Sequence, residues 1–188
     1  MRDRKNIANI TIAAMFTAVG LILPFLTGQI QQIGNMLLPM HIPVLLCGLI
    51  CGWQYGLVTG LTLPVLRYFL FGMPVLFPTG IAMAFELAAY GAVSGLFYSR
   101  SRWKCMIALY RSLLAAMLSG RIVWAVVQLL LLGAGGDGFT WKMFISGAFV
   151  NAVPGIILQL ILIPVVMLAL DRTGLVHFAR KKTAESGE

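Results

Sequence analysis

The chain has 188 residues and a formal net charge of +8, and 60% of its residues are apolar whereas only 11% are charged. So large an apolar share excludes a water-soluble domain of this size, because a single core could not bury it all. The surplus Lys and Arg residues gather beside apolar stretches, so we expect them to contact anionic lipid headgroups and not nucleic acid.

Six apolar stretches predict six transmembrane helices within one domain. In chain order they cover residues 7–26, 37–52, 55–71, 77–98, 104–132 and 142–170. A helix needs about 20 residues to cross the hydrocarbon core, so the second and third helices look short. We therefore expect an all-α, integral membrane bundle over residues 1–188, with the lipid bilayer as its solvent.

Basic clusters alternate with these stretches and predict the orientation. They consist of Arg2, Arg4 and Lys5 before the first helix, Arg100, Arg102 and Lys104 after the fourth, and Arg172, Arg180, Lys181 and Lys182 after the sixth. The connections on the opposite side contain a single basic residue, Lys142. Because positively charged loops stay in the cytoplasm, both termini are expected to be cytoplasmic.

Proline interrupts the short helices and the approach to the fourth. Pro39 and Pro43 open the second helix, Pro64 lies inside the third, and Pro74 and Pro78 lie where the fourth begins. Proline in a span frees backbone groups that neighbours or water in a cavity must satisfy. Short, broken segments of this kind indicate a binding region, whereas prolines that only cap helix ends would say nothing of function.

Two connections on the predicted outer side have a composition suited to binding. Residues 28–35 read GQIQQIGN and include Gln32 and Asn35, and residues 133–142 read GAGGDGFTWK. Amides donate and accept hydrogen bonds without carrying charge, and glycines let a loop close over a ligand. The alternative is a pair of solvated loops without a role.

Three charged residues lie at membrane depth, namely Arg67, Glu86 and Arg121. Each costs about 2.5–3.5 kcal/mol at the bilayer centre on insertion scales, so each should face the bundle interior and have a partner. If Glu86 pairs with one arginine, the other is free to receive a carboxylate from a ligand. Alternatively, both arginines share Glu86 or bond to carbonyl groups freed near Pro64 and Pro154.

Polar side chains recur at helical spacing beside these charges. Trp124 and Gln128 follow Arg121 on one helix, Tyr90 follows Glu86 on another, and the sixth helix adds Asn151 and Gln159. Such residues converging from three helices predict a pocket for a small polar molecule. A hydrogen-bond network between helices would use similar residues.

The sequence lacks the motifs of catalysis and of metal binding. It has neither a Gly-rich phosphate loop nor His-Glu-x-x-His. His41 stands alone among apolar residues near the outer mouth, where we expect a capping or packing role, and contact with a ligand is the alternative. Cys47 and Cys51 are expected to be small core residues. We therefore predict no enzyme activity, no cofactor and no metal.

Small residues on the first helix form a candidate contact surface. Ala14 and Ala18 lie one turn apart on the same face, and such a groove lets another helix approach closely. Packing inside the bundle is the alternative. The fourth helix is even richer in alanine and glycine and is expected to pack within the bundle.

Two segments resemble a known family. Residues 41–72 read HIPVLLCGLICGWQYGLVTGLTLPVLRYFLFG and residues 85–98 read FELAAYGAVSGLFY. The first segment resembles the same region of the substrate-binding S component of an energy-coupling factor (ECF) vitamin transporter, in which a leading proline and spaced glycines recur. The positions that carry this likeness are Pro43, Gly48, Gly52, Gly56 and Gly60.

The resemblance implies a function for the whole chain. The family binds a vitamin or micronutrient near the extracellular face of the bacterial cell membrane and delivers it through a membrane coupling subunit that two ATPase subunits power. It also implies that Ala14 and Ala18 contact the coupling subunit and that Gln32 and Asn35 belong to a gating loop. The spare positive charge favours a small acid such as pantothenate as cargo. A stand-alone, ion-coupled secondary transporter of a small organic solute is the alternative.

Overall fold

The computed structural model describes residues 2–26, 39–101, 105–135 and 153–172, and these residues are almost entirely helical. The helices are α1 (Arg2–Leu26), α3 (His41–Cys51), α4 (Trp53–Phe71), the short η1 (Leu76–Gly80), α5 (Ile81–Arg100), α6 (Met106–Gly135) and α8 (Val153–Arg172). The predicted all-α class is thus confirmed for the described part of the chain.

Four helical segments in the described residues are long and apolar enough to cross a membrane. They are Asn6–Phe25, Leu76–Arg100, Met106–Leu131 and Val153–Asp171. Helix α3 is apolar but has only 11 residues, about half of what a full span needs. The chain is therefore a multi-pass membrane protein, and the number of six spans stays a prediction.

Several helix boundaries differ from those predicted. Helix α1 already begins at Arg2, and α3 begins at His41, because Pro39 and Met40 form a turn. The predicted start of the second helix at residue 37 and that of the sixth at residue 142 lie outside the described residues. So does residue 104, where the fifth helix was expected to begin.

The predicted fourth helix is divided in two. Phe77 has an extended backbone, with φ −114° and ψ 133°, so the regular helix α5 starts only at Ile81. The residue that follows is Pro78, and its ring disfavours the helical conformation at the residue before it. The proline at the approach to this helix therefore favours a late start of the regular helix.

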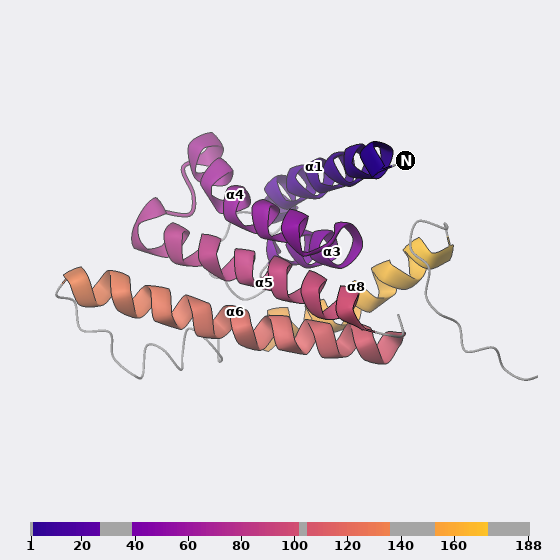
Figure 1. Cartoon of the computed structure of the whole chain (residues 1–188). Coiled ribbons are helices and arrows are strands. Elements are labelled where there is room, and N and C mark those ends of the chain that lie inside the picture. Colours follow the sequence, from indigo (N-terminus) through magenta and orange to yellow (C-terminus); the bar gives the residue numbers. More distant parts are fainter. Residues whose placement is uncertain (1, 27–38, 102–104, 136–152, 173–188) are drawn as a thin grey trace, which may run out of the picture.

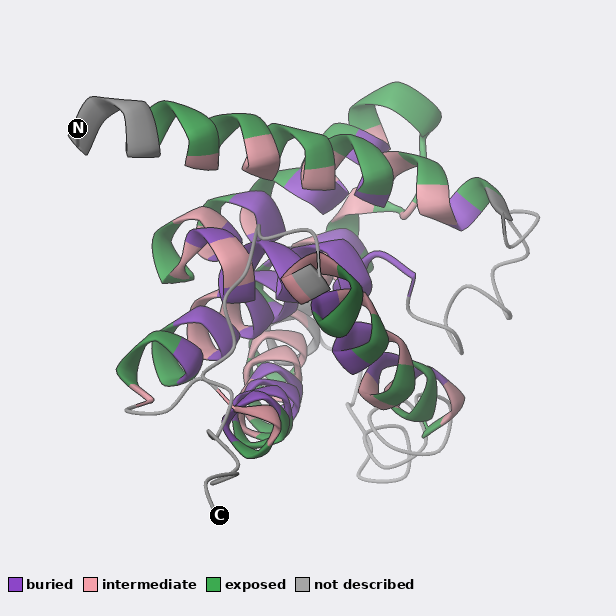
Figure 2. Ribbon diagram, turned by 90° about the vertical axis from the view of Figure 1, so that its right-hand side faces the viewer, coloured by how far each residue is buried: buried purple, intermediate pink, exposed green. Residues whose placement is uncertain are grey.

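Helix α5 lies at the centre of the bundle. It packs against α3, α4 and α6, whereas α1 packs on α3 and α4, and α8 contacts α6 and α3 (Figure 1). The colouring in Figure 2 shows buried residues gathered where these helices meet and exposed residues along the outer side of α1. Residues on α5 can therefore contact several helices at once, as can those on α3.

Glycines allow α3, α4 and α5 to approach closely. A Cβ atom on Gly56 would lie 2.6 Å from the carbonyl oxygen of Gly91, and one on Gly95 would lie 2.5 Å from the backbone nitrogen of Trp53. A Cβ on Gly60 would overlap the backbone of Leu87. The spaced glycines of α4 thus meet glycines and backbone of α5, and the contact is formed by the main chain.

The ends of the helices that adjoin basic clusters lie on one side of the bundle. In Figure 1 the N-terminal end of α1, the C-terminal end of α5, the N-terminal end of α6 and the C-terminal end of α8 are all at the right. The turn from α4 to η1 and the C-terminal end of α6 are at the left. This arrangement is what the alternating charge pattern requires, and the cytoplasmic location of the right-hand side stays a prediction.

Candidate functional site

Two of the charged residues at membrane depth form an ion pair between α5 and α6. Arg121 Nη1 lies 3.1 Å from Glu86 Oε1. Both residues are buried, with 2% of Glu86 and 7% of Arg121 exposed. Opposite charges at this separation compensate part of the cost of removing each from water. The expectation that these charges face inward and have a partner therefore holds for Glu86 and Arg121.

A third titratable residue joins this pair from α3. His41 Nε2 lies 3.6 Å from the same Glu86 oxygen, and the His41 ring meets the Tyr90 ring edge-on with 4.9 Å between centroids. The packing role expected for His41 agrees with its burial and its contact with Tyr90, whereas its contact with Glu86 was not expected. We call His41, Glu86, Tyr90 and Arg121 the buried polar cluster.

Tyr90 also fixes the spacing of α5 and α6 beside the ion pair. Its ring is buried, and a Cβ atom placed on Gly120 would lie 2.6 Å from that ring. Gly120 immediately precedes Arg121, so the missing side chain lets α6 come close enough for Arg121 to reach Glu86. The geometry of the cluster therefore depends on a glycine as well as on its charged members.

Several buried polar atoms near the interior have no hydrogen-bond partner among the described residues. They are Nε and Nη2 of Arg121, both ring nitrogens of His41, Oε1 of Gln128, and both amide atoms of Gln159. Gln159 lies on α8 and is only 1% exposed. A buried donor or acceptor without a partner costs about 1–3 kcal/mol. Such atoms can be satisfied by a polar ligand that enters between the helices.

Arg67 lies apart from the cluster. Its Nη1 donates to the carbonyl oxygen of Leu21 at 3.5 Å, and its guanidinium lies 5.7 Å from the centroid of the Phe25 ring. It is 7% exposed and has no salt-bridge partner among the described residues. Of the two arginines, Arg121 thus pairs with Glu86. Arg67 bonds to a carbonyl group, which belongs to α1 and not to the surroundings of Pro64 or Pro154.

The other predicted site residues are placed only in part. Trp124 and Gln128 are half-buried on α6, on the turns that follow Arg121. Gln32, Asn35 and Asn151 lie outside the described residues. The structure therefore brings together Glu86, Tyr90 and Arg121 from the predicted set and adds His41. The sequence signal for His41 was its position in an otherwise apolar helix, where an unpartnered imidazole is costly.

The small-residue groove on α1 faces away from the other described helices. Ala14 and Ala18 are both exposed, as are the neighbouring Met15 and Ile22. Gly20, on the inner side, faces Leu63 and Pro43. The outer surface of α1 is seen along the top of Figure 2. Internal packing of Ala14 and Ala18, the alternative stated above, is therefore wrong.

Comparison with known proteins identifies the family. A family model described as "ECF transporter, substrate-specific component" matches residues 8–167. No curated protein and no solved structure gave a match. The matched range includes the buried polar cluster, the glycine contacts of α3, α4 and α5, and the outer face of α1. The chain therefore belongs to the family of substrate-specific components of ECF transporters.

Proposed function

We propose that this chain captures a vitamin or related micronutrient at the extracellular side of a bacterial cell membrane and delivers it through a membrane coupling subunit powered by two ATPase subunits. Family membership supports the role of a substrate-specific subunit. The buried polar cluster is the observation that carries the proposal. Charged groups at membrane depth are costly and mark substrate pathways in membrane proteins.

The balance of buried charge favours a small acid such as pantothenate as cargo. Glu86 and Arg121 compensate each other, so Arg67 is the buried cation that lacks an anion among the described residues. A guanidinium binds a carboxylate through two parallel hydrogen bonds, which its single bond to Leu21 leaves possible. We assign the cargo carboxylate to Arg67 and the uncharged polar groups of the cargo to Arg121, Gln128 and Gln159.

The position of Arg67 supports this assignment. Its guanidinium lies against Phe25 near the end of α1. The chain continues from there into residues 27–38, which include Gln32 and Asn35 of the expected gating loop. A carboxylate bound at Arg67 would therefore lie close to the point where that loop leaves α1. Trp124, Asn151 and the gating-loop amides complete the proposed site.

A thermal-shift screen of the purified chain against a panel of vitamins tests the proposal. A ligand present at about 1,000 times its dissociation constant should add about 4 kcal/mol to the free energy of unfolding. We expect saturable stabilisation by pantothenate. If no vitamin stabilises the chain saturably, it is not a vitamin-binding subunit. Stabilisation by a vitamin without a carboxylate would contradict the acid-cargo assignment alone.

A variant separates the carboxylate contact from the rest of the site. Arg67→Gln should weaken pantothenate binding at least about tenfold, equivalent to about 1.4 kcal/mol. Panthenol, which has a hydroxyl in place of the carboxylate, should bind the variant and the original protein alike. Arg111→Gln, which removes an exposed cation, is the matched control. Equal losses for both ligands would show that Arg67 does not contact the carboxylate.

One observation favours the alternative of an ion-coupled secondary transporter. The buried, titratable His41 lies 3.6 Å from a Glu86 oxygen, and paired His and carboxylate groups form proton relays in carriers. Liposomes that contain only this chain distinguish the two functions. Accumulation of cargo under a proton gradient would show a stand-alone carrier, whereas an S component accumulates cargo only when the coupling subunit and ATPases are present.

A further inference from the structure

A cleft lies at the end of the bundle opposite to the expected cargo side. It has a volume of about 470 Å³ and opens between the last turns of α5 and the first turns of α6. Its lining residues include Phe97, Arg100, Cys105, Ile107 and Arg111. None of them belongs to the buried polar cluster. Arg100 belongs to the basic cluster that follows the fourth predicted helix, whose cations are expected to contact anionic headgroups, whereas no binding cleft was expected there.

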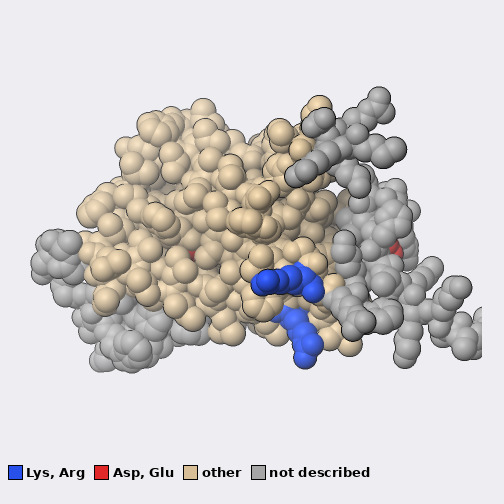
Figure 3. All heavy atoms as spheres, viewed as in Figure 1, with Lys and Arg blue, Asp and Glu red and all other residues tan. Residues whose placement is uncertain are grey.

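The cleft carries two guanidinium groups from different helices. Arg100 ends α5 and Arg111 lies on α6, and both are exposed. Neither has a salt-bridge partner in the described part of the chain. In Figure 3 two groups of blue atoms lie next to each other on a face that is mostly tan, and the little red that is visible lies away from them. Two cations that share a cleft and lack anions form a binding site for an anion.

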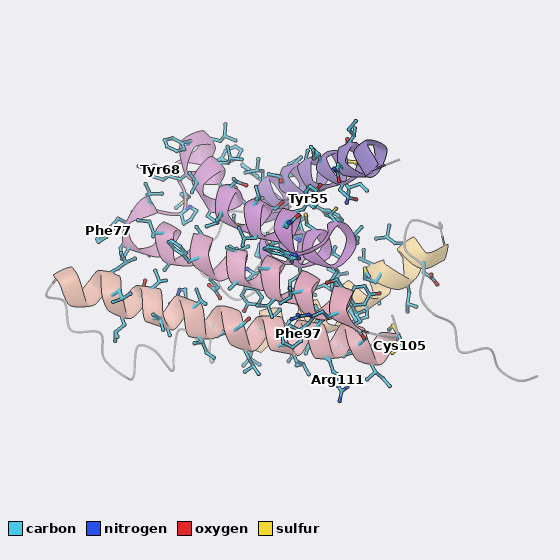
Figure 4. All side chains as sticks on the ribbon, in the orientation of Figure 1. Tyr55, Tyr68, Phe77, Phe97, Cys105 and Arg111 are labelled. Atoms are coloured by element: carbon cyan, nitrogen blue, oxygen red, sulfur yellow. The ribbon has the colours of Figure 1, made fainter. Side chains whose placement is uncertain are left out.

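The position of the cleft corresponds to the depth of lipid headgroups. One candidate span ends at Arg100 and the next begins at Met106, so the cleft lies across the ends of two spans. Arg111 is about 7 Å further along α6, a depth from which a long cationic side chain reaches the interface. Figure 4 shows Phe97, Cys105 and Arg111 at this end, with Arg111 pointing outward.

The walls of the cleft combine these cations with exposed apolar side chains. Phe97 is 52% exposed and Ile107 is 70% exposed, and both line the cleft. A soluble anion would leave these side chains uncovered, whereas the acyl chains of a lipid would cover them. The volume is within the range of small-molecule sites and is larger than a phosphate alone requires. The lining therefore matches an amphiphile with a phosphate at its polar end.

We propose that this cleft binds the phosphate group of an anionic membrane lipid, with Arg100 and Arg111 as its ligands. Basic pockets between transmembrane helices on the cytoplasmic side recognise such headgroups. A contact with the coupling subunit fits the site less well. The outer face of α1, which is the expected contact surface, lies across the bundle from Arg111 in Figure 4.

Native mass spectrometry of the full chain in detergent tests the proposal. We titrate the protein with dioleoyl phosphatidylglycerol or with dioleoyl phosphatidylcholine, which have the same acyl chains and differ in net charge. The anionic lipid should bind at least about tenfold more tightly. Equal affinity for the two lipids would overturn the proposal.

Paired variants locate the binding. Arg100→Gln with Arg111→Gln should remove the preference for phosphatidylglycerol, and Arg100→Lys with Arg111→Lys should restore part of it because the charge returns. Lys181→Gln with Lys182→Gln changes the net charge by the same amount and serves as the control. If this control loses the preference equally, the effect is bulk electrostatics and the proposal fails.

Two further outcomes would show that the cleft binds something other than a lipid. Displacement of the lipid by excess inorganic phosphate would assign the cleft to a free anion and would overturn the lipid assignment. If the glutamine pair keeps its lipid preference but no longer assembles with the coupling subunit, the cleft is a protein interface. Unchanged thermal stability and helical circular dichroism verify that the variants are folded, as expected for exposed side chains.

Discussion

Breaking the ion pair between Glu86 and Arg121 should lower the free energy of unfolding strongly. Glu86→Gln removes the anion and leaves Arg121, which is 7% exposed, without a charge partner in the described interior. Breaking a buried pair by removing one member costs about 3–5 kcal/mol. His41, 3.6 Å from the same oxygen, loses its acidic neighbour as well. We therefore expect a loss in the upper part of that range.

Chemical unfolding in detergent, followed by circular dichroism, measures this loss. Arg121→Gln should destabilise the protein by a similar amount because it leaves Glu86 buried and uncompensated. Arg111→Gln is the matched control, since it changes an exposed arginine on the same helix, where substitutions stay within about 0.5 kcal/mol. The double variant Glu86→Leu with Arg121→Met should recover most of the stability, because replacing a whole buried pair by apolar residues is close to neutral.

The double variant also separates stability from binding. It should fold and yet bind cargo more weakly, since Arg121 supplies two guanidinium atoms without hydrogen-bond partners in the described interior. Losses below about 1 kcal/mol in both single variants would refute the reasoning, because they would mean that water reaches the pair and screens it. If the loss of stability in the double variant equals the sum of the two single losses, the direct contact between the side chains would be refuted as well.

Two further predictions concern the helix contacts. Gly91→Ala should destabilise the protein by about 1–3 kcal/mol in the same unfolding assay, because the added Cβ would overlap the carbonyl group of Gly56 on α4. A stabilised variant would show that α4 and α5 are further apart. Ala14→Leu with Ala18→Leu should leave cargo affinity and stability unchanged and abolish uptake by the assembled transporter, because both residues are exposed on α1. Uptake at the normal rate would exclude this face as the contact with the coupling subunit.

The fold class and the inward orientation of the charges follow from the sequence by simple energetics. An apolar share of 60% requires the bilayer as solvent. The cost of charge in hydrocarbon requires Glu86 to have a partner. The choice between Arg67 and Arg121 as that partner could not be predicted, since it depends on how α4 and α6 are rotated around α5. The structure turns Arg121 toward Glu86, whereas Arg67 reaches the carbonyl group of Leu21 on α1.

Some helix boundaries can be predicted from the neighbouring residues, and others cannot. The extended backbone at Phe77 is favoured by the proline after it, a bias that the sequence shows. The late start of α3 could not be predicted, because the apolar pattern continues unchanged from residue 37 through the turn at Pro39 and Met40. Hydrophobicity reports burial in lipid or protein, and within a membrane it does not distinguish a helix from a buried turn.

His41 shows that the cost of burying a polar group applies to neutral side chains as well as to charged ones. A buried imidazole has two polar nitrogens, and an apolar helix such as α3 offers neither of them a partner. The cost that predicts an inward-facing partner for Glu86 therefore predicts a polar neighbour for His41 as well, and its Nε2 lies 3.6 Å from a Glu86 oxygen. A carboxylate that contacts two basic residues from different helices ties α3, α5 and α6 together at one point. Cargo that competes for these polar atoms must therefore change contacts among three helices, which couples binding to the packing of the bundle.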